Sequence, residues 1–268
     1  MSIITISSEV LRDGEALAER VATILGYRCV SREQLIEASQ RYGIPEAKFT
    51  EILETGPNWW KRWLESTRLY RTVLQATMYE VVQGGNVVYH GHAGQEFFAG
   101  IRHVLKILIT APVEYRMAQV QAAEGLDAIQ AKRYIGQVDK ARRRRLHALF
   151  GADWCDPTRY DLVVNTARIS LETATHLILE IVKREDYQPT IDSEELFQDL
   201  TIKARAHAAL IRYPKTKHLD IEVKVVKRDV YLSGTLHQPD SESEIIRVVQ
   251  AVPGVNKVIS DLKLFWFL

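Results

Sequence analysis

The first residues with the types and spacing for chemistry lie in a short turn near the start of the chain. An apolar run, Ile3–Ile6, precedes the turn, and apolar residues recur at helical spacing from Ala16 to Leu25 after it. A helix that begins directly after a buried strand presents free backbone amides and the positive end of its dipole, and these bind phosphate. The sequence therefore predicts a phosphate-binding turn, with the contacts made by Ser7, Arg12, Asp13, Gly14 and Glu15.

Two carboxylates in this turn argue against ordinary phosphate binding. A typical phosphate loop has several glycines followed by Lys and Ser or Thr, whereas here only Gly14 interrupts the turn and no lysine follows it. Two unit charges about 4 Å apart interact by about 1 kcal/mol in water and by several times more in a drier site, so Asp13 would repel an anion. Two readings stay open. In one, Arg12 folds over the phosphate and compensates; in the other, the turn is a plain connection in which Asp13 caps the helix.

The elements that would position this turn alternate between strands and helices. Strands are predicted at 3–6, 27–30, 87–89, 104–110 and 162–165, and helices near 14–25, 31–41, 59–83, 113–123, 125–149 and 170–184. Strands rich in Val, Ile and Leu that alternate with helices predict an α/β fold, with a parallel sheet covered on both faces.

The pattern changes after residue 183. Residues 184–194 are polar, contain Pro189 and lack periodicity, so they are predicted to be a linker. Beyond it we expect a helix at 195–211, strands at 221–226 and 229–233, a helix at 242–251 and a strand at 257–267. This order, αββαβ, predicts a small second α+β domain over residues 195–268.

Composition limits the classes of partner and the compartment. The 35 basic and 34 acidic residues nearly cancel, which argues against a nucleic-acid binder, although Lys140–Arg145 form a local basic run. The two cysteines, Cys29 and Cys155, are too few for a disulfide framework or a four-cysteine zinc site. With neither a secretory leader nor a membrane-spanning run in evidence, we expect a cytoplasmic protein. The apolar end, Phe265–Leu268, favours pairing with a second copy of the chain or covering of the first domain.

Four segments of the first domain together resemble the cytidylate kinase-like family of P-loop nucleoside monophosphate kinases. They are Ile4–Ala18, Asn86–Ala93, Ile109–Arg116, and Asp139–Arg142 continuing to Gly151–Thr166. The resemblance covers residues 1–183 and implies a P-loop kinase-like parallel sheet. Separately, Val230–Thr235 and Val252–Val258 resemble a BON domain, which implies binding of a lipid, another hydrophobic ligand or a protein partner.

The resemblance also implies roles for individual residues. Arg116 matches a family arginine that reaches nucleotide phosphates, and Arg142 follows Asp139 at the family spacing, so these three are the candidate catalytic residues. Arginines on a mobile lid neutralise a transferring phosphoryl group and exclude water. Arg143–Arg145 are interpreted as a solvated helix face.

Substrate contacts are assigned to residues outside the turn. His92 stands where the family has an arginine, and it either contacts a monophosphate or is a polar residue at a strand end. Trp59 and Trp63, four residues apart on one helix face, either stack on a base or pack a small subdomain. No group of side chains predicts a metal site.

Two hypotheses of different classes follow. In the first, the protein transfers phosphate from ATP, with Mg²⁺, to a nucleoside monophosphate such as CMP. In the second, the kinase-like domain is a catalytically inactive sensor that binds a nucleotide or another phosphorylated small molecule, and the BON module reports to a lipid or protein partner.

Overall fold

A five-stranded parallel sheet forms the centre of the first domain. The computed structural model describes residues 2–42, 60–91, 93–213, 216, 219, 221–236 and 241–264, with the side chains of 60–67 and 241 left out. The sheet has the order β2-β3-β1-β4-β5, and every pairing in it is parallel, which confirms the predicted α/β architecture. Its strands are β1 (Ile3–Ser8), β2 (Arg28–Ser31), β3 (Val87–His90), β4 (Val104–Thr110) and β5 (Leu162–Asn165).

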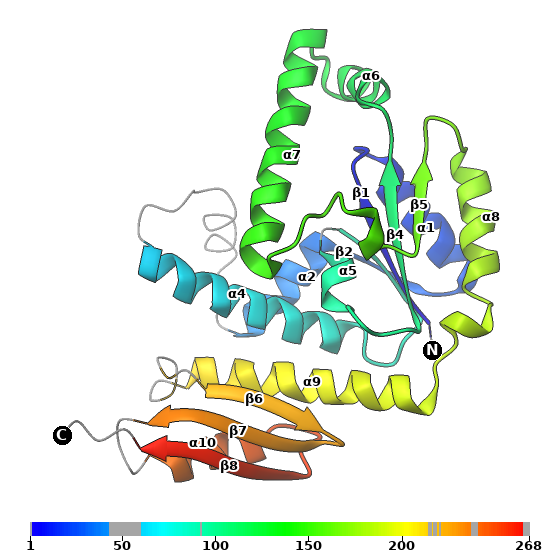
Figure 1. Cartoon of the computed structure of the whole chain (residues 1–268). Helices are drawn as coiled ribbons and strands as arrows, with labels where there is room; N and C mark the ends of the chain where they lie inside the picture. The colour runs from blue at the N-terminus through cyan, green and yellow to red at the C-terminus, as the bar shows by residue number, and fades with distance from the viewer. Residues whose placement is uncertain are drawn as a thin grey trace.

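Helices cover both faces of this sheet because its strands are apolar on both sides (Figure 1). Two helices, α1 (Asp13–Leu25) and α8 (Leu171–Ile181), cover one face and share a core with Ile4 and Ile6 of β1. The opposite face carries α2 (Arg32–Ser39) with η1 (Gln40–Tyr42), α4 (Trp60–Val81), α5 (Gly94–Phe97) and the end of α7 (Ala128–Phe150).

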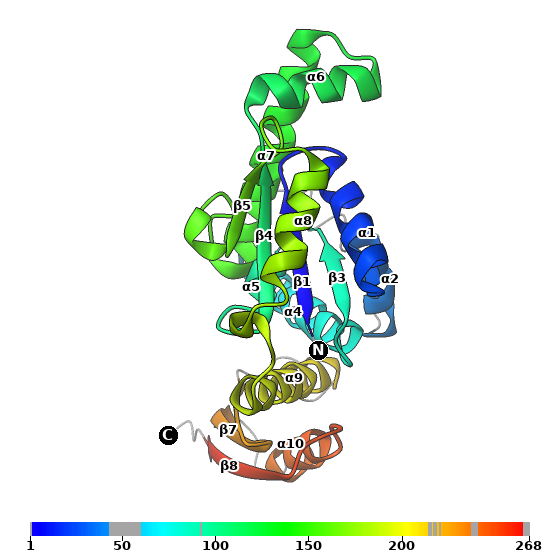
Figure 2. The ribbon, with the colours of Figure 1, turned by 90° about the vertical axis from the view of Figure 1, so that its right-hand side faces the viewer.

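A helical hairpin projects beyond the carboxyl ends of the strands. Figure 2 shows α6 (Val113–Glu124) and the start of α7 above β4, on the side opposite the second domain. A small cluster of Val120, Ala131 and Ile135 holds the two helices together. The chain then returns to the sheet through η2 (Pro157–Arg159). This hairpin occupies the place of the predicted lid.

The second domain has the predicted αββαβ order. It consists of α9 (Ile191–Arg212), β6 (Ile221–Val226), β7 (Asp229–Leu236), α10 (Ser241–Gln250) and β8 (Lys257–Leu264). Its sheet has the order β6-β7-β8, with β6 and β7 antiparallel and β7 and β8 parallel.

Helix α9 begins about one turn before the predicted start. Residues 184–190 contain η3 (Glu185–Tyr187), and α9 then begins at Ile191 instead of 195. The physical reason is a capping box, in which Thr190 accepts from the Ser193 amide and the Ser193 side chain accepts from the Thr190 amide. The last four residues of the predicted linker are therefore helical.

Helix α9 also belongs to two cores. One face places Phe197, Leu200 and Ala204 against α4 and the first domain, and another places Ile202 and Ala206 in the core of the second domain. The ring of Phe197 lies edge-on to Tyr79 at 5.6 Å. The two domains therefore meet along a packed helix and not only through a linker.

Two further findings concern membranes and metals. No helix within the described ranges has both the length and the apolar character needed to cross a membrane. In the same part of the chain, no three His, Cys, Asp or Glu side chains come together in a way that could hold a metal ion. The segment Phe265–Leu268 lies outside the described residues, so its predicted pairing stays a prediction.

Candidate functional site

The turn between β1 and α1 is anchored to the sheet on both sides. The Glu9 amide donates to the carbonyl of Ile109 at 2.8 Å, and the Val10 amide donates to Ser8 Oγ at 3.0 Å. The Val10 side chain is buried in the core beneath α1. A Cβ on Gly14 would lie 2.5 Å from Ser8 Cβ, so only glycine allows the helix to start so close to the strand. The backbone therefore keeps a tight strand–turn–helix connection.

The first residue of α1, Asp13, buries its carboxylate in this connection. Its side chain is shielded, since the residue is 7% exposed, and Oδ1 accepts from Gln119 Nε2 of α6 at 3.2 Å. Oδ2 has no hydrogen-bond partner among the described residues. The start of a helix attracts an anion, and here the protein supplies the anion itself.

The other predicted residues of the turn lie at its surface. Arg12 is the N-cap residue of α1, and its side chain is exposed and makes no capping bond. Glu15 is also exposed, one residue after Gly14. With a buried carboxylate at Asp13 and no lysine after Gly14, this turn does not fit the triphosphate of ATP with its magnesium ion.

The predicted catalytic pair, Arg116 and Asp139, forms a two-point ion pair across the lid. Arg116 Nη1 and Nη2 donate to the two carboxylate oxygens of Asp139 at 2.9 and 2.6 Å. Arg116 is buried, whereas the Asp139 side chain is 29% exposed, so only the guanidinium side of the pair is shielded from solvent. Such forked contacts are strong and fix both side chains, so this pair ties α6 to α7.

Arg142 anchors α7 to the turn. Its Nη1 donates to the carbonyl of Ser8 at 2.8 Å, and its guanidinium lies over the Trp154 ring, 5.6 Å from the centroid. Burial lowers the pKa of the Arg142 guanidinium, while nearby Asp139 opposes that shift. The predicted catalytic arginine is thus held by a backbone carbonyl and an aromatic face beside the turn between β1 and α1.

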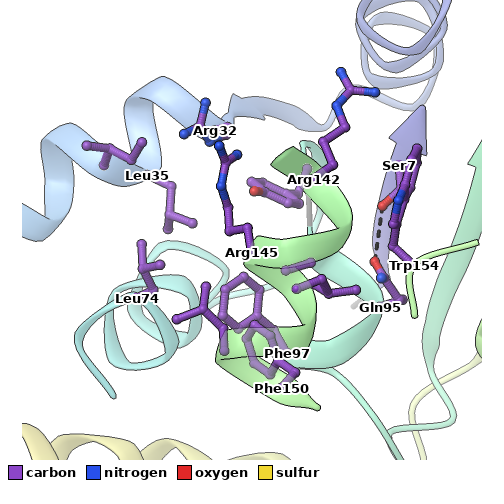
Figure 3. A pocket seen from close by; sticks show the side chains of 15 residues that line it. Ser7, Arg32, Leu35, Leu74, Gln95, Phe97, Arg142, Arg145, Phe150 and Trp154 are labelled. Atoms are coloured by element: carbon purple, nitrogen blue, oxygen red, sulfur yellow. Dashed lines mark hydrogen bonds between the residues drawn. The ribbon is translucent and has the colours of Figure 1, made fainter. Parts of the chain in front are cut away.

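A cavity opens next to this turn, beneath α7. It measures about 660 Å³ including its open mouth, and β3, α2, α4, α5 and α7 surround it. Figure 3 shows the arginines on one side, with Arg145 extending toward Arg32, and Phe97 and Phe150 on the other. The lining comprises four aromatic residues, three arginines, two polar residues and a set of aliphatic ones: Tyr89, Phe97, Phe150, Trp154; Arg32, Arg142, Arg145; Ser7, Gln95; and Leu35, Ile36, Leu74, Ala93, Leu146, Leu149.

The Gln95 amide in this lining has a donor group that is left without a protein partner. Ser7 Oγ donates to Gln95 Oε1 at 3.1 Å and fixes the amide, as the dashed line in Figure 3 marks. Gln95 is 3% exposed, and its Nε2 has no partner within the described residues. Because a buried donor without an acceptor is costly, this amide is suited to hydrogen-bond a ligand in the cavity.

The predicted site residues fall into three groups. Ser7 and Arg142 line the cavity, whereas Arg116 and Asp139 pair with one another above it. Asp13 and Gly14 form the adjoining turn. His92, Trp59 and the side chain of Trp63 lie outside the described residues, so their roles stay predictions.

Arg32 and Gln95 line the cavity but were not predicted as site residues, and Arg145 was wrongly assigned to the solvated face of its helix. Arg143 and Arg144 are exposed as expected, but Arg145 is half-buried and lines the cavity. The signal for this was helical spacing, because Arg142, Arg145 and Leu149 recur at intervals of three and four on α7. No comparable local pattern marks Gln95.

Comparison with known proteins identifies the first domain. The model of the cytidylate kinase-like family matches residues 3–168. The chain belongs to this family. The BON domain model matches residues 198–264, which contain most of α9 and all of the second sheet.

Individual relatives agree with this membership. The chain is similar to the cytidylate kinase of Methanopyrus kandleri, with 30% identity over 184 residues that cover 63% of this chain and 89% of the relative. Similarity to the cytidylate kinase of Pyrobaculum aerophilum is 25% over 181 residues, covering 67% and 92%. An uncharacterized protein from Eubacterium ventriosum shares the fold, with a TM-score of 0.52, 16% identity, and coverage of 68% of this chain and 97% of that one. As a member of a cytidylate kinase-like family, the chain has a nucleotide kinase-like fold and ancestry.

Proposed function

We propose that this protein binds a nucleoside monophosphate in the cavity beneath α7 and acts as a nucleotide sensor that does not transfer phosphate. The observation that carries the proposal is the buried Asp13 carboxylate at the start of α1, where this fold receives the phosphates of ATP. It would repel them at close range.

The cavity supports the binding half of the proposal. Aromatic walls from Phe97, Phe150 and Trp154 suit a flat base, and arginines at one side suit a phosphate group. The unpartnered Gln95 amide offers a hydrogen bond to an acceptor on the base. An aromatic ring joined to an anionic group is the ligand that uses all three features.

The arginines nearest the turn support the absence of transfer. Both Nη groups of Arg116 are engaged by Asp139, and Arg142 Nη1 is engaged by the Ser8 carbonyl. A phosphoryl group moving through this region would have to replace these contacts while lying close to Asp13. The lid arginines therefore bind other groups of the protein itself, namely the Asp139 carboxylate and the Ser8 carbonyl.

A second candidate is a divergent nucleoside monophosphate kinase that uses ATP and magnesium. Family membership and the preserved lid favour it, since Arg116, Asp139 and Arg142 all stand at the carboxyl edge of the sheet. In that case the cavity would hold the acceptor nucleotide, and Asp13 would have to move away from the turn. A lipid or protein partner for the BON domain, a cytoplasmic location and assembly into homo-oligomers stay predictions in either case.

Isothermal titration of CMP and of ATP, with and without magnesium, into the full-length protein separates the two candidates. The sensor predicts saturable CMP binding, weak ATP binding and no ADP formation on incubation with both nucleotides. ADP formation that depends on CMP would refute the sensor and favour the kinase.

Two variants locate the binding site. Arg32→Gln removes a charge at the cavity and should weaken CMP binding about tenfold, the usual effect of losing one charge-assisted contact. Arg20→Gln, an exposed position on α1, is the matched control and should bind CMP like the unmodified protein. Equal affinities for all three proteins would contradict the assignment of this cavity.

A further inference from the structure

A second cavity lies on the other side of α7, between the two domains. It measures about 1050 Å³ including its open mouth, and α4, the end of α7 and α9 form its walls. We name it the basic groove; it is lined by Arg68, Arg71, Thr72, Gln75, Ala148, Leu149, Leu200, Lys203, Ala204 and His207. One wall belongs to the kinase-like domain and the other to the segment matched by the BON model.

The charges of the basic groove come from two helices that face one another. On α4, Arg68 and Arg71 are one turn apart, and on α9, Lys203 and His207 are one turn apart. Residues three or four apart share a helix face, so both pairs point into the same space. Among the described residues that line it there is no acidic side chain and no Phe, Tyr or Trp. The groove therefore offers three permanent positive charges and a histidine, but no large aromatic ring for stacking a base.

One of these arginines is already held in position. Arg71 Nη1 donates to the carbonyl of Leu149 at 3.5 Å, and its guanidinium lies 5.9 Å from the centroid of the Phe150 ring. Leu149 lines both cavities, so the same turn of α7 separates the basic groove from the nucleotide cavity. A side chain fixed before binding loses less conformational freedom on binding, which increases the affinity for a ligand.

We propose that the basic groove is a second ligand site, distinct from the nucleotide cavity, for a compact anion with several phosphate groups. Charge recognition without Phe, Tyr or Trp walls suits phosphates that carry no base, and three cations suit more than one phosphate. Because Arg68 and Lys203 come from different domains, the site exists only where α4 and α9 pack together. The phosphate groups can belong to a soluble molecule or to a lipid headgroup, which the experiment distinguishes.

The test titrates inorganic tripolyphosphate into the full-length protein by calorimetry. We expect one saturable site, and we expect the double variant Arg68→Gln/Lys203→Gln to bind about 100-fold more weakly, since it loses two charge-assisted contacts worth about tenfold each. The double variant Arg168→Gln/Arg184→Gln, which removes two exposed charges elsewhere, is the matched control and should bind normally. Tripolyphosphate binding that is unchanged in the groove variant, or equally weakened in the control, would overturn the proposal.

Sedimentation with vesicles separates the two sources of phosphate. Vesicles of phosphatidylcholine containing phosphatidic acid should bind the protein through the groove if the phosphates are those of a lipid, and this binding should fail in the groove variant. Tripolyphosphate binding without vesicle binding identifies a soluble ligand. Groove-dependent binding of a short DNA duplex by a protein that does not bind tripolyphosphate would contradict a small-anion site. None of these readouts requires CMP binding, so their failure is distinct from failure of the proposed nucleotide function.

Discussion

Neutralising Asp13 should let the turn between β1 and α1 accept ATP. The substitution Asp13→Asn removes the charge but keeps an oxygen that can accept from Gln119 Nε2. At an effective dielectric constant of about 20, two unit charges about 5 Å apart repel by about 3 kcal/mol, which corresponds to about 100-fold in affinity. Salt screening reduces this figure, so we expect ATP to bind at least about tenfold more tightly to the variant.

The assay is calorimetric titration of ATP into both proteins at the same ionic strength. Glu15→Gln is the charge-matched control, because Glu15 is exposed in the same helical turn whereas Asp13 is 7% exposed. An exposed charge interacts by only about 1 kcal/mol, so this control should change the ATP affinity by about fivefold at most. If Asp13→Asn binds ATP no better than Glu15→Gln does, the buried carboxylate is not what excludes ATP, and the argument for a sensor loses its main support.

Three predictions concern stability. Gly14→Ala should destabilise the protein by about 1–3 kcal/mol, because the new Cβ would lie 2.5 Å from Ser8 Cβ. Gly136→Ala, where a Cβ meets nothing within 4 Å, should leave the stability unchanged or increase it. Equal changes in the free energy of unfolding in urea for the two variants would contradict the close approach of Gly14 to Ser8. Phe197→Ala should cost about 3 kcal/mol at the contact between the domains, and an unchanged unfolding midpoint would mean that this contact contributes little. Burial lowers the pKa of His103, so the unfolded chain takes up the proton first as the pH falls below about 6.5, and the free energy of unfolding declines there. His103→Asn should reduce this decline between about pH 7.5 and 5.5. An identical pH dependence of stability in the variant would refute the assignment of the decline to His103.

The order of the elements could be predicted because it depends on local patterns. Apolar runs and helical spacing located all five strands of the first sheet and the αββαβ order of the second domain. The start of α9 was misplaced because the polar segment 184–194 hides a capping box at Thr190 and Ser193. Such a cap is a local signal, and it could have been found next to Pro189.

The candidate site could be predicted only in part. The family resemblance indicated Arg116, Asp139 and Arg142 as a group, but it did not show that Arg116 pairs with Asp139, 23 residues away, or that Arg142 binds the Ser8 carbonyl. Both contacts depend on how the lid folds back over the sheet. Their partners are therefore a property of the tertiary structure.

By itself, the sequence determined the type and order of the elements, the family resemblance and the shortage of glycines and the missing lysine in the turn between β1 and α1. Only the tertiary structure decided that the Asp13 carboxylate is buried, that Gln95 presents an unpartnered amide to the cavity, and that α9 serves two cores. The physical reason is that periodicity and propensity act over a few neighbouring residues, whereas burial and hydrogen bonding depend on segments brought together from distant parts of the chain.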